Sequence, residues 1–241
     1  MKIAEYIANT IDRLPKGYVF TYEDFMEEVK SKEAAIKSLN RLVASGKISK
    51  LSKGKYYKPE KTVFGTLAPT QYQVVKDLLE SDSKVIGYLT GLSIYSELGL
   101  TTQVSNTIQI GKNEVRPSFK RDRYTISFVR QRNTITRENI PLLQLLDAAR
   151  YIKRIPDITI ADACRRLKEL ISDLSDREEK TIVRLSQKYP PSTRALLGAV
   201  LESLGRETYI NSIKKTLNPI TKYKLKGAAN ILPTAENWNI K

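Results

Sequence analysis

Few residues in this sequence have the types and spacing of a catalytic site. The pattern that comes closest to one is a carboxylate two residues before a lysine. It occurs three times, in Glu28-Val29-Lys30, Asp82-Ser83-Lys84 and Glu178-Glu179-Lys180. Metal-dependent nucleases can use carboxylates and a lysine on adjacent strands without any histidine. Two of the triplets fall in helical patterns, and the third precedes a strand but lacks an evident second carboxylate on a neighbouring strand. A nuclease is therefore the alternative interpretation and not the main one.

Other catalytic and cofactor chemistries are excluded by residue types that are missing. The chain has no histidine and one cysteine, Cys164. Ser-His-Asp and Cys-His nucleophiles, His-ligated zinc and a thiolate metal cage are therefore impossible. Neither a GxxxxGK[ST] phosphate loop nor a GxGxxG turn occurs. We expect no enzyme, no cofactor and no metal, and we expect Cys164 to be a packed small apolar residue in a protein of a reducing compartment, the cytoplasm.

Positive charge is the chemical feature that stands out. The 241 residues carry 41 Lys and Arg against 26 Asp and Glu, a net charge of +15, which favours a polyanionic partner such as nucleic acid. Between Lys30 and Lys61 there are ten basic residues and only two acids. The residues that we expect to contact DNA lie in this segment: Ser31, Lys32, Lys37, Ser38, Arg41, Lys50, Lys53 and Lys55.

The elements around these residues have the order of a winged helix-turn-helix. Apolar spacing predicts helices over residues 2–14, 21–29 and 32–45, the last capped by Ser31. Alternation then predicts a hairpin over residues 47–58. Lys37, Ser38 and Arg41 fall opposite the apolar stripe of the third helix, which suits a helix laid in a major groove, while the hairpin lysines suit phosphates. The alternative is an ordinary basic surface helix.

We expect an α+β protein of two domains, an N-terminal winged helix-turn-helix (residues 1–61) and a C-terminal domain (residues 62–241). Residues 62–138 show mixed α/β patterning, residues 139–217 are mostly helical, and the tail 218–241 is anchored by Trp238. The basic stretch from Lys112 to Arg137 has two possible interpretations. It is either a second surface for nucleic acid or the edge strand of a sheet whose charges prevent pairing with other chains, and we favour the second interpretation.

Several short motifs, in order, resemble the AbiEi-like antitoxins and transcriptional regulators of bacterial AbiE abortive-infection systems. They are Gly54-Lys55-Tyr56-Tyr57-Lys58-Pro59, Phe64-Gly65, Gly87-Tyr88-Leu89-Thr90-Gly91-Leu92-Ser93, Glu97-Leu98-Gly99-Leu100-Thr101-Thr102-Gln103, Leu196-Leu197-Gly198-Ala199, Leu217-Asn218-Pro219, Tyr223-Lys224-Leu225 and Asn237-Trp238. The resemblance implies an N-terminal domain that binds double-stranded DNA at inverted repeats and represses its own operon. It also implies a C-terminal domain that counteracts a cognate AbiEii-like nucleotidyltransferase toxin, and it implies no catalytic residues.

The main interpretation is an antitoxin that regulates its own operon. The two alternatives are a DNA-targeted enzyme and a plain winged-helix repressor without a toxin. A membrane partner is not expected, because the longest stretches without Asp, Glu, Lys or Arg are 14 residues and a spanning helix needs about 20 apolar residues.

Overall fold

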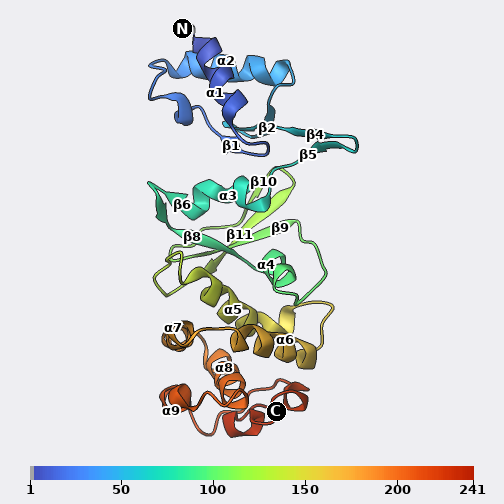
Figure 1. Ribbon diagram of the computed structural model, residues 1–241, viewed down its shortest axis with the longest axis vertical. Helices are drawn as coiled ribbons and strands as arrows, with labels where there is room; N and C mark the ends of the chain where they lie inside the picture. The colour runs from blue at the N-terminus through green and yellow to red at the C-terminus, as the bar shows by residue number, and fades with distance from the viewer. Residues whose placement is uncertain (1–2) are drawn as a thin grey trace. The chain divides into compact units, whose positions relative to one another are not determined.

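The computed structural model describes residues 3–241 and combines helices with several small sheets in a mixed α+β fold (Figure 1). The chain divides into two compact units. The first runs to Leu78 and also includes Phe119–Thr125, and the second comprises Leu79–Ser118 and Ile126–Lys241. Sequence patterning suggested a boundary near residue 61, whereas residues 62–78 are grouped here with the N-terminal unit.

The first unit is built from short elements. They are α1 (Ile3–Arg13), β1 (Val19–Phe20), the 3-10 turn η1 (Glu23–Phe25), α2 (Lys32–Ala44), β2 (Ser49–Ser52), β3 (Lys55–Tyr57), β4 (Glu60–Thr62), β5 (Gly65–Leu67), nearly all of α3 (Gln71–Leu79), and β10 (Phe119–Arg121). Strands β1, β3 and β2 form an antiparallel sheet in that order. Strands β4 and β5 form a separate ribbon whose tip residues, Val63 and Phe64, are 94% and 97% exposed.

The predicted helix over residues 21–29 is wrong, because the chain makes only the single 3-10 turn η1 there. The Asp24 carboxylate accepts hydrogen bonds from the backbone N–H and the hydroxyl of Thr21 (2.6 and 3.2 Å), which closes a tight local turn. The Val29 N–H donates to the Phe25 carbonyl (3.0 Å), and both side chains are buried. The chain then extends through Ser31 (φ −110°, ψ 110°) to start α2.

The core of the first unit is small and partly aromatic. It consists of Ile7, Ile11, Phe20, Phe25, Val29, Ala35, Leu39, Ile48 and Tyr56. The Phe20 ring meets Phe25 edge to face at 5.8 Å and stacks on Tyr56 at 6.3 Å between centroids. Offset and edge-to-face pairs of this kind stabilise beyond the area that they bury. This core therefore ties the hairpin strand β3 to the helices.

The second unit joins strands to a helical part. Its elements are β6 (Glu80–Ser81), β7 (Lys84–Val85), β8 (Gly87–Thr90), α4 (Leu92–Glu97), β9 (Thr107–Lys112), most of β11 (Tyr124–Arg130), α5 (Ile140–Tyr151), η2 (Ile152–Arg154), α6 (Ile160–Ser172), α7 (Asp176–Ser186), α8 (Pro191–Ser203), η3 (Glu207–Tyr209), α9 (Ile210–Lys214), η4 (Ala228–Asn230) and η5 (Ala235–Trp238). Strands β11, β9 and β8 are hydrogen-bonded neighbours in that order within this unit. The predicted helical segment over residues 139–217 is confirmed.

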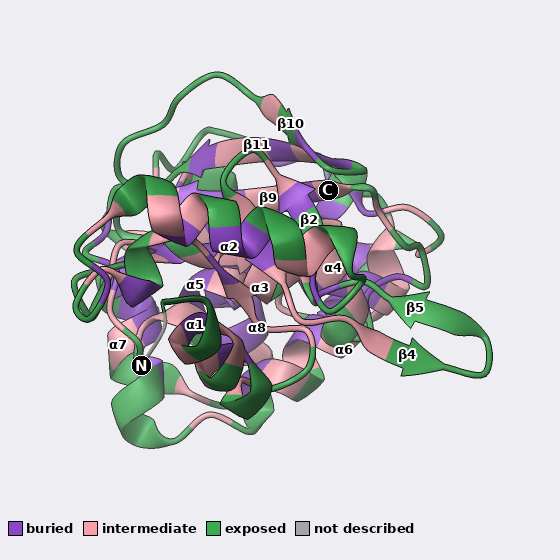
Figure 2. Ribbon diagram, turned by 90° about the horizontal axis from the view of Figure 1, so that it is seen from above, coloured by how far each residue is buried: buried purple, intermediate pink, exposed green. Residues whose placement is uncertain are grey.

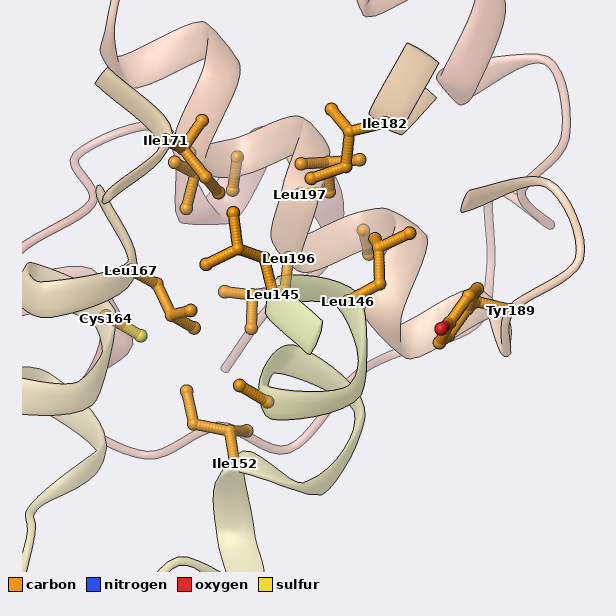
Figure 3. Packing of buried hydrophobic residues seen from close by; sticks show 14 of the residues in the cluster. Leu145, Leu146, Ile152, Cys164, Leu167, Ile171, Ile182, Tyr189, Leu196 and Leu197 are labelled. Atoms are coloured by element: carbon orange, nitrogen blue, oxygen red, sulfur yellow. The ribbon is translucent and has the colours of Figure 1, made fainter. Parts of the chain in front are cut away.

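One large apolar cluster holds the helical part together. Figure 3 shows side chains from four helices converging in it, among them Leu146 of α5, Leu167 of α6, Ile182 of α7 and Leu197 of α8. Cys164 is fully buried in the same cluster, as expected of a packed apolar residue. Burial raises the pKa of its thiol to about 11.

The tail is fixed by its single tryptophan, as predicted. Trp238 is 2% exposed and lies against Gly198 of α8, and its indole N–H donates to Glu202 Oε2 at 2.6 Å. Tyr223 and Ile240 form a parallel bridge within the tail. Across residues 3–241, no helix is both long and apolar enough to span a bilayer.

Candidate nucleic-acid interface

Helix α2 is held in the first unit by its cap and by one apolar side. The Ser31 hydroxyl accepts a hydrogen bond from the Ala34 N–H (3.3 Å) and so satisfies one of the free donors at the helix start. Ala35 and Leu39 are fully buried in the core. With that side fixed, the opposite side of α2 must face solvent.

The exposed side of α2 carries Lys37 and Arg41, as predicted. Both are exposed, and they line a shallow surface hollow of about 500 Å³ together with Glu33, Ile36, Asn40 and Ala44. Figure 2 shows exposed and buried bands alternating along α2. The structure shows no ion pair that would hold either cation to the rest of the described chain. Two long basic side chains one helical turn apart are therefore available to a ligand.

Three other predicted contacts on or beside this helix turn out differently. Ser38 is only 5% exposed, so its predicted contact with DNA is wrong: it lies one turn beyond Ala35 and beside Leu39, at the edge of the buried stripe. Ser31 is occupied as the helix cap. Lys32 is exposed, with its ammonium group 4.7 Å from the centroid of the Tyr22 ring, where it is weakly held by a cation–π contact.

The hairpin of β2 and β3 lies beside α2 and is joined to it by Tyr56. This side chain is buried and its hydroxyl donates to Asn40 Oδ1 at 3.2 Å, so Tyr56 is part of the core. Lys50 and Lys53 are exposed, and Lys53 stands in the turn next to Gly54. The hairpin thus presents two cations, although three were predicted.

The third predicted wing cation, Lys55, is engaged elsewhere in the first unit. Its ammonium group lies 3.1 Å from Asp77 Oδ2, and its side chain is 19% exposed. The same carboxylate receives two hydrogen bonds from the buried guanidinium of Arg121, at 2.6 and 3.1 Å. Burial raises the pKa of Asp77, but the hydrogen bonds and charges of Arg121 and Lys55 outweigh it, so the pKa is lowered overall. Lys55 is therefore held in an ion pair within the first unit and, unlike Lys50 and Lys53, is not a free cation of the hairpin.

A buried polar network in the second unit was missed by sequence reasoning. Asp147 of α5 is almost fully buried and accepts hydrogen bonds from the hydroxyls of Tyr88 (2.7 Å), Thr90 (2.9 Å) and Tyr189 (2.9 Å). Gln131 Nε2 donates to both tyrosine oxygens, each at 2.8 Å. The one signal in the sequence was an acid inside the apolar run Leu145-Leu146-Asp147-Ala148-Ala149.

Burial dominates the electrostatics of this network. It raises the pKa of Asp147 even though the three hydroxyl donors act to lower it. It also raises the pKa of Tyr88 and of Tyr189, so both phenols remain neutral donors. A buried network with every member bonded rigidifies its surroundings.

The candidate metal and nuclease residues do not come together. In the part of the chain that the structure describes, no group of three or more His, Cys, Asp or Glu side chains is placed to hold a metal ion. Glu178 and Glu179 lie on helix α7, where Glu178 forms a capping box with Ser175 and Glu179 pairs with Arg206. The Asp82 triplet lies in the tight turn between β6 and β7.

Residues 6–170 match a model for a protein family of unknown function, DUF6088. The chain belongs to the DUF6088 family. No curated protein matches this sequence. Among solved structures, the crystal structure of the RV2827C protein from Mycobacterium tuberculosis is similar, with a TM-score of 0.53 and 18% identity over 94% of this chain and 84% of that one. At this identity the likeness concerns the fold alone.

Proposed function

We propose that the first unit of this DUF6088 protein is a winged helix-turn-helix that binds double-stranded DNA. The observation that carries the proposal is the exposed, unpaired Lys37 and Arg41 side of α2, next to a hairpin that presents Lys50 and Lys53. The order α1, η1, α2, β2, β3, with β1 completing the sheet, supports it. In this scheme η1 stands where a full helix would precede the recognition helix.

The chemistry of each side chain suggests its role on DNA. A helix in the major groove directs side chains at base edges, and Arg41 has the planar fork that pairs with guanine O6 and N7. Lys37, one turn earlier, can reach a base or a phosphate of the same groove. Lys50 and Lys53 are flexible point charges suited to phosphate oxygens.

The test is binding of the full chain to its upstream promoter DNA. Replacing both Lys37 and Arg41 with Ala should weaken specific binding at least about tenfold, since one base-reading contact contributes about 1–3 kcal/mol. A matched control, Arg13→Ala with Lys84→Ala, removes two exposed cations outside α2 and the hairpin. Unchanged promoter binding by a folded α2 variant would show that recognition lies elsewhere.

The salt dependence should separate the hairpin from the helix. Lys53→Ala should lower the slope of log K against log salt by about one and weaken promoter and random DNA alike, because a lost phosphate contact releases fewer counterions. An effect on sequence preference alone would contradict the role that we propose for Lys53.

At the cellular level we propose an antitoxin of the bacterial cytoplasm that represses its own operon, counteracts a nucleotidyltransferase-like toxin and has no catalytic activity. This step rests on the resemblance of the motifs around Gly54, Gly87 and Gly198 to the AbiEi-like family. The test is co-expression with the adjoining open reading frame. Rescue from a toxic neighbour supports the antitoxin role, a harmless neighbour indicates a plain repressor, and magnesium-dependent cleavage of DNA by the pure protein would indicate the nuclease alternative.

A further inference from the structure

The second unit contains three adjoining hollows that the proposed DNA contacts do not use. Their volumes are about 610, 490 and 470 Å³. Arg150 and Pro190 line both the first and the third, Tyr151 and Arg154 line both the first and the second, and Arg130 lines both the second and the third. Because they share walls, the three hollows adjoin one another, and together we call them the second-unit groove.

The groove is lined by cations and by no acid. Nine basic side chains contribute: Arg130, Arg132, Arg150, Lys153, Arg154, Lys188, Arg194, Lys222 and Lys224. None of them pairs with an Asp or Glu through the ion pairs that the structure shows for residues 3–241. Arg150 and Arg154 stand one helical turn apart, where like charges repel. Mutual repulsion among these cations lowers the stability of the fold. A bound anionic ligand would offset that loss, so ligand binding explains the cluster better than folding does.

Two buried polar groups in the walls lack partners. Tyr223 lines the first hollow and Arg194 lines the third. The Tyr223 hydroxyl and the Arg194 Nε are themselves buried, and neither has a hydrogen-bond partner in the described structure. Tyr223 is 8% exposed. Buried donors left without acceptors are costly.

Aromatic side chains accompany the charges. The guanidinium groups of Arg150 and Arg154 lie 5.0 and 5.6 Å from the centroid of the Tyr151 ring. Tyr151 lines the first and second hollows, and Phe128 lines the second. A cationic groove with aromatic faces is the arrangement that binds the backbone and the bases of an unpaired strand together.

The Asp147 network forms a rigid floor under one end of the groove. Gln131 and Tyr189 both line the third hollow and both belong to that network. Figure 3 shows Tyr189 beside the leucine cluster of α5 and α8, so its position is set by packing as well as by hydrogen bonds. A groove with a fixed floor needs less ordering when it binds a ligand.

We propose that the second-unit groove binds single-stranded nucleic acid, with Arg and Lys on the phosphates and Tyr151 against a base. Nine cations spread over three hollows fit a chain of several phosphates better than one nucleotide. A concave wall of side chains also suits one strand better than the convex surface of a duplex. The groove is independent of the α2 surface, so this proposal does not depend on promoter binding by the first unit.

The test measures binding of the full chain to labelled oligo(U), oligo(dT) and a non-promoter duplex of equal length, each about 12 nucleotides. Arg154→Glu with Lys224→Glu alters the first hollow, and Arg132→Glu with Lys188→Glu alters the third. Each pair should weaken binding of a single strand at least about tenfold, because a strand that crosses the groove contacts both ends. Tyr151→Ala should weaken it about fivefold through lost stacking.

Two controls keep the outcome decisive. The first control, Lys180→Glu with Lys215→Glu, makes the same change of net charge at exposed positions outside the groove. The second is the α2 pair, Lys37→Ala with Arg41→Ala. Each should change the affinity for single strands less than about twofold. If a groove variant fails to fold, Arg154→Gln and Lys188→Gln alone serve instead. Equal loss in the control and groove variants, or full competition by ATP against the 12-mer, would overturn the proposal. So would an equal loss of duplex and single-strand binding when the groove pairs are replaced in the Lys37→Ala with Arg41→Ala background, where the duplex site of the first unit is already weakened. Oligo(U) against oligo(dT) then tells whether the strand is RNA or DNA.

Discussion

Replacing Gly198 with alanine should destabilise the second unit, although helix propensity alone predicts the opposite. Gly198 lies inside α8, where alanine is favoured over glycine by about 1 kcal/mol. A Cβ on Gly198, however, would lie 2.2 Å from both Cη2 and Cζ3 of Trp238. Carbon atoms prefer separations of about 3.5–4.0 Å, so the indole must move by more than about 1 Å.

Little around Trp238 can accommodate that movement. Its indole N–H is bonded to Glu202, which lies on the same helix as Gly198, and the Lys214 ammonium group lies 5.0 Å from the centroid of the indole ring. Overpacking in a core costs about 1–3 kcal/mol, and complete loss of a buried Trp side chain costs about 3–5 kcal/mol. After the gain of about 1 kcal/mol in propensity, we expect a net loss of about 1–3 kcal/mol.

The assay is thermal and denaturant unfolding followed by circular dichroism in all variants, and also by tryptophan fluorescence in those that keep Trp238. A loss of 1 kcal/mol lowers the melting temperature of a domain of this size by about 2–4 °C. In a Trp238→Ala background the clash is absent, and Gly198→Ala should then stabilise by about 1 kcal/mol. A higher melting temperature for Gly198→Ala in the wild-type background, or no coupling between the two substitutions, would refute the reasoning.

Three further outcomes are expected. Burial raises the pKa of Asp147 above that of the unfolded chain, so the folded state holds its proton more tightly. The wild type should therefore lose stability relative to Asp147→Asn as pH rises from about 4 through the folded pKa; parallel pH profiles in urea melts would contradict this. Because burial raises the pKa of the Cys164 thiol to about 11, a disulfide reagent at about pH 8 should label native protein at least about tenfold more slowly than unfolded protein, and equal rates would count against burial. Val63→Ser with Phe64→Ser should change the free energy of unfolding by less than about 0.5 kcal/mol, because both side chains are exposed at the ribbon tip; a larger loss would show that the tip packs against something.

Local patterns that need few residues were readable in the sequence. The apolar stripe of residues 32–45, its Ser31 cap and the following hairpin were all predicted and are present, because each depends on neighbours within a few positions. The outward direction of Lys37 and Arg41 followed from the same stripe. The helical character of residues 139–217 was predictable for the same reason. The burial of Cys164 and Trp238 was predicted from residue type, since a lone cysteine without histidine and a lone tryptophan are usually packed.

Distant partners were decided only by the tertiary structure. In the sequence, Lys55 cannot be told apart from the other lysines of the hairpin. In the fold it lies beside Asp77 and Arg121, which are 44 residues apart in the chain. The Asp147 network joins β8, α5 and the loop between α7 and α8 in the same way. The segment over residues 21–29, predicted to be a helix, contains only the 3-10 turn η1, and yet Phe25 and Val29 are both buried. Spacing along the chain predicts which residues share a face of a helix or strand. Which charged groups and hydroxyls come into contact depends on how those faces pack, and the packing is set by the whole core.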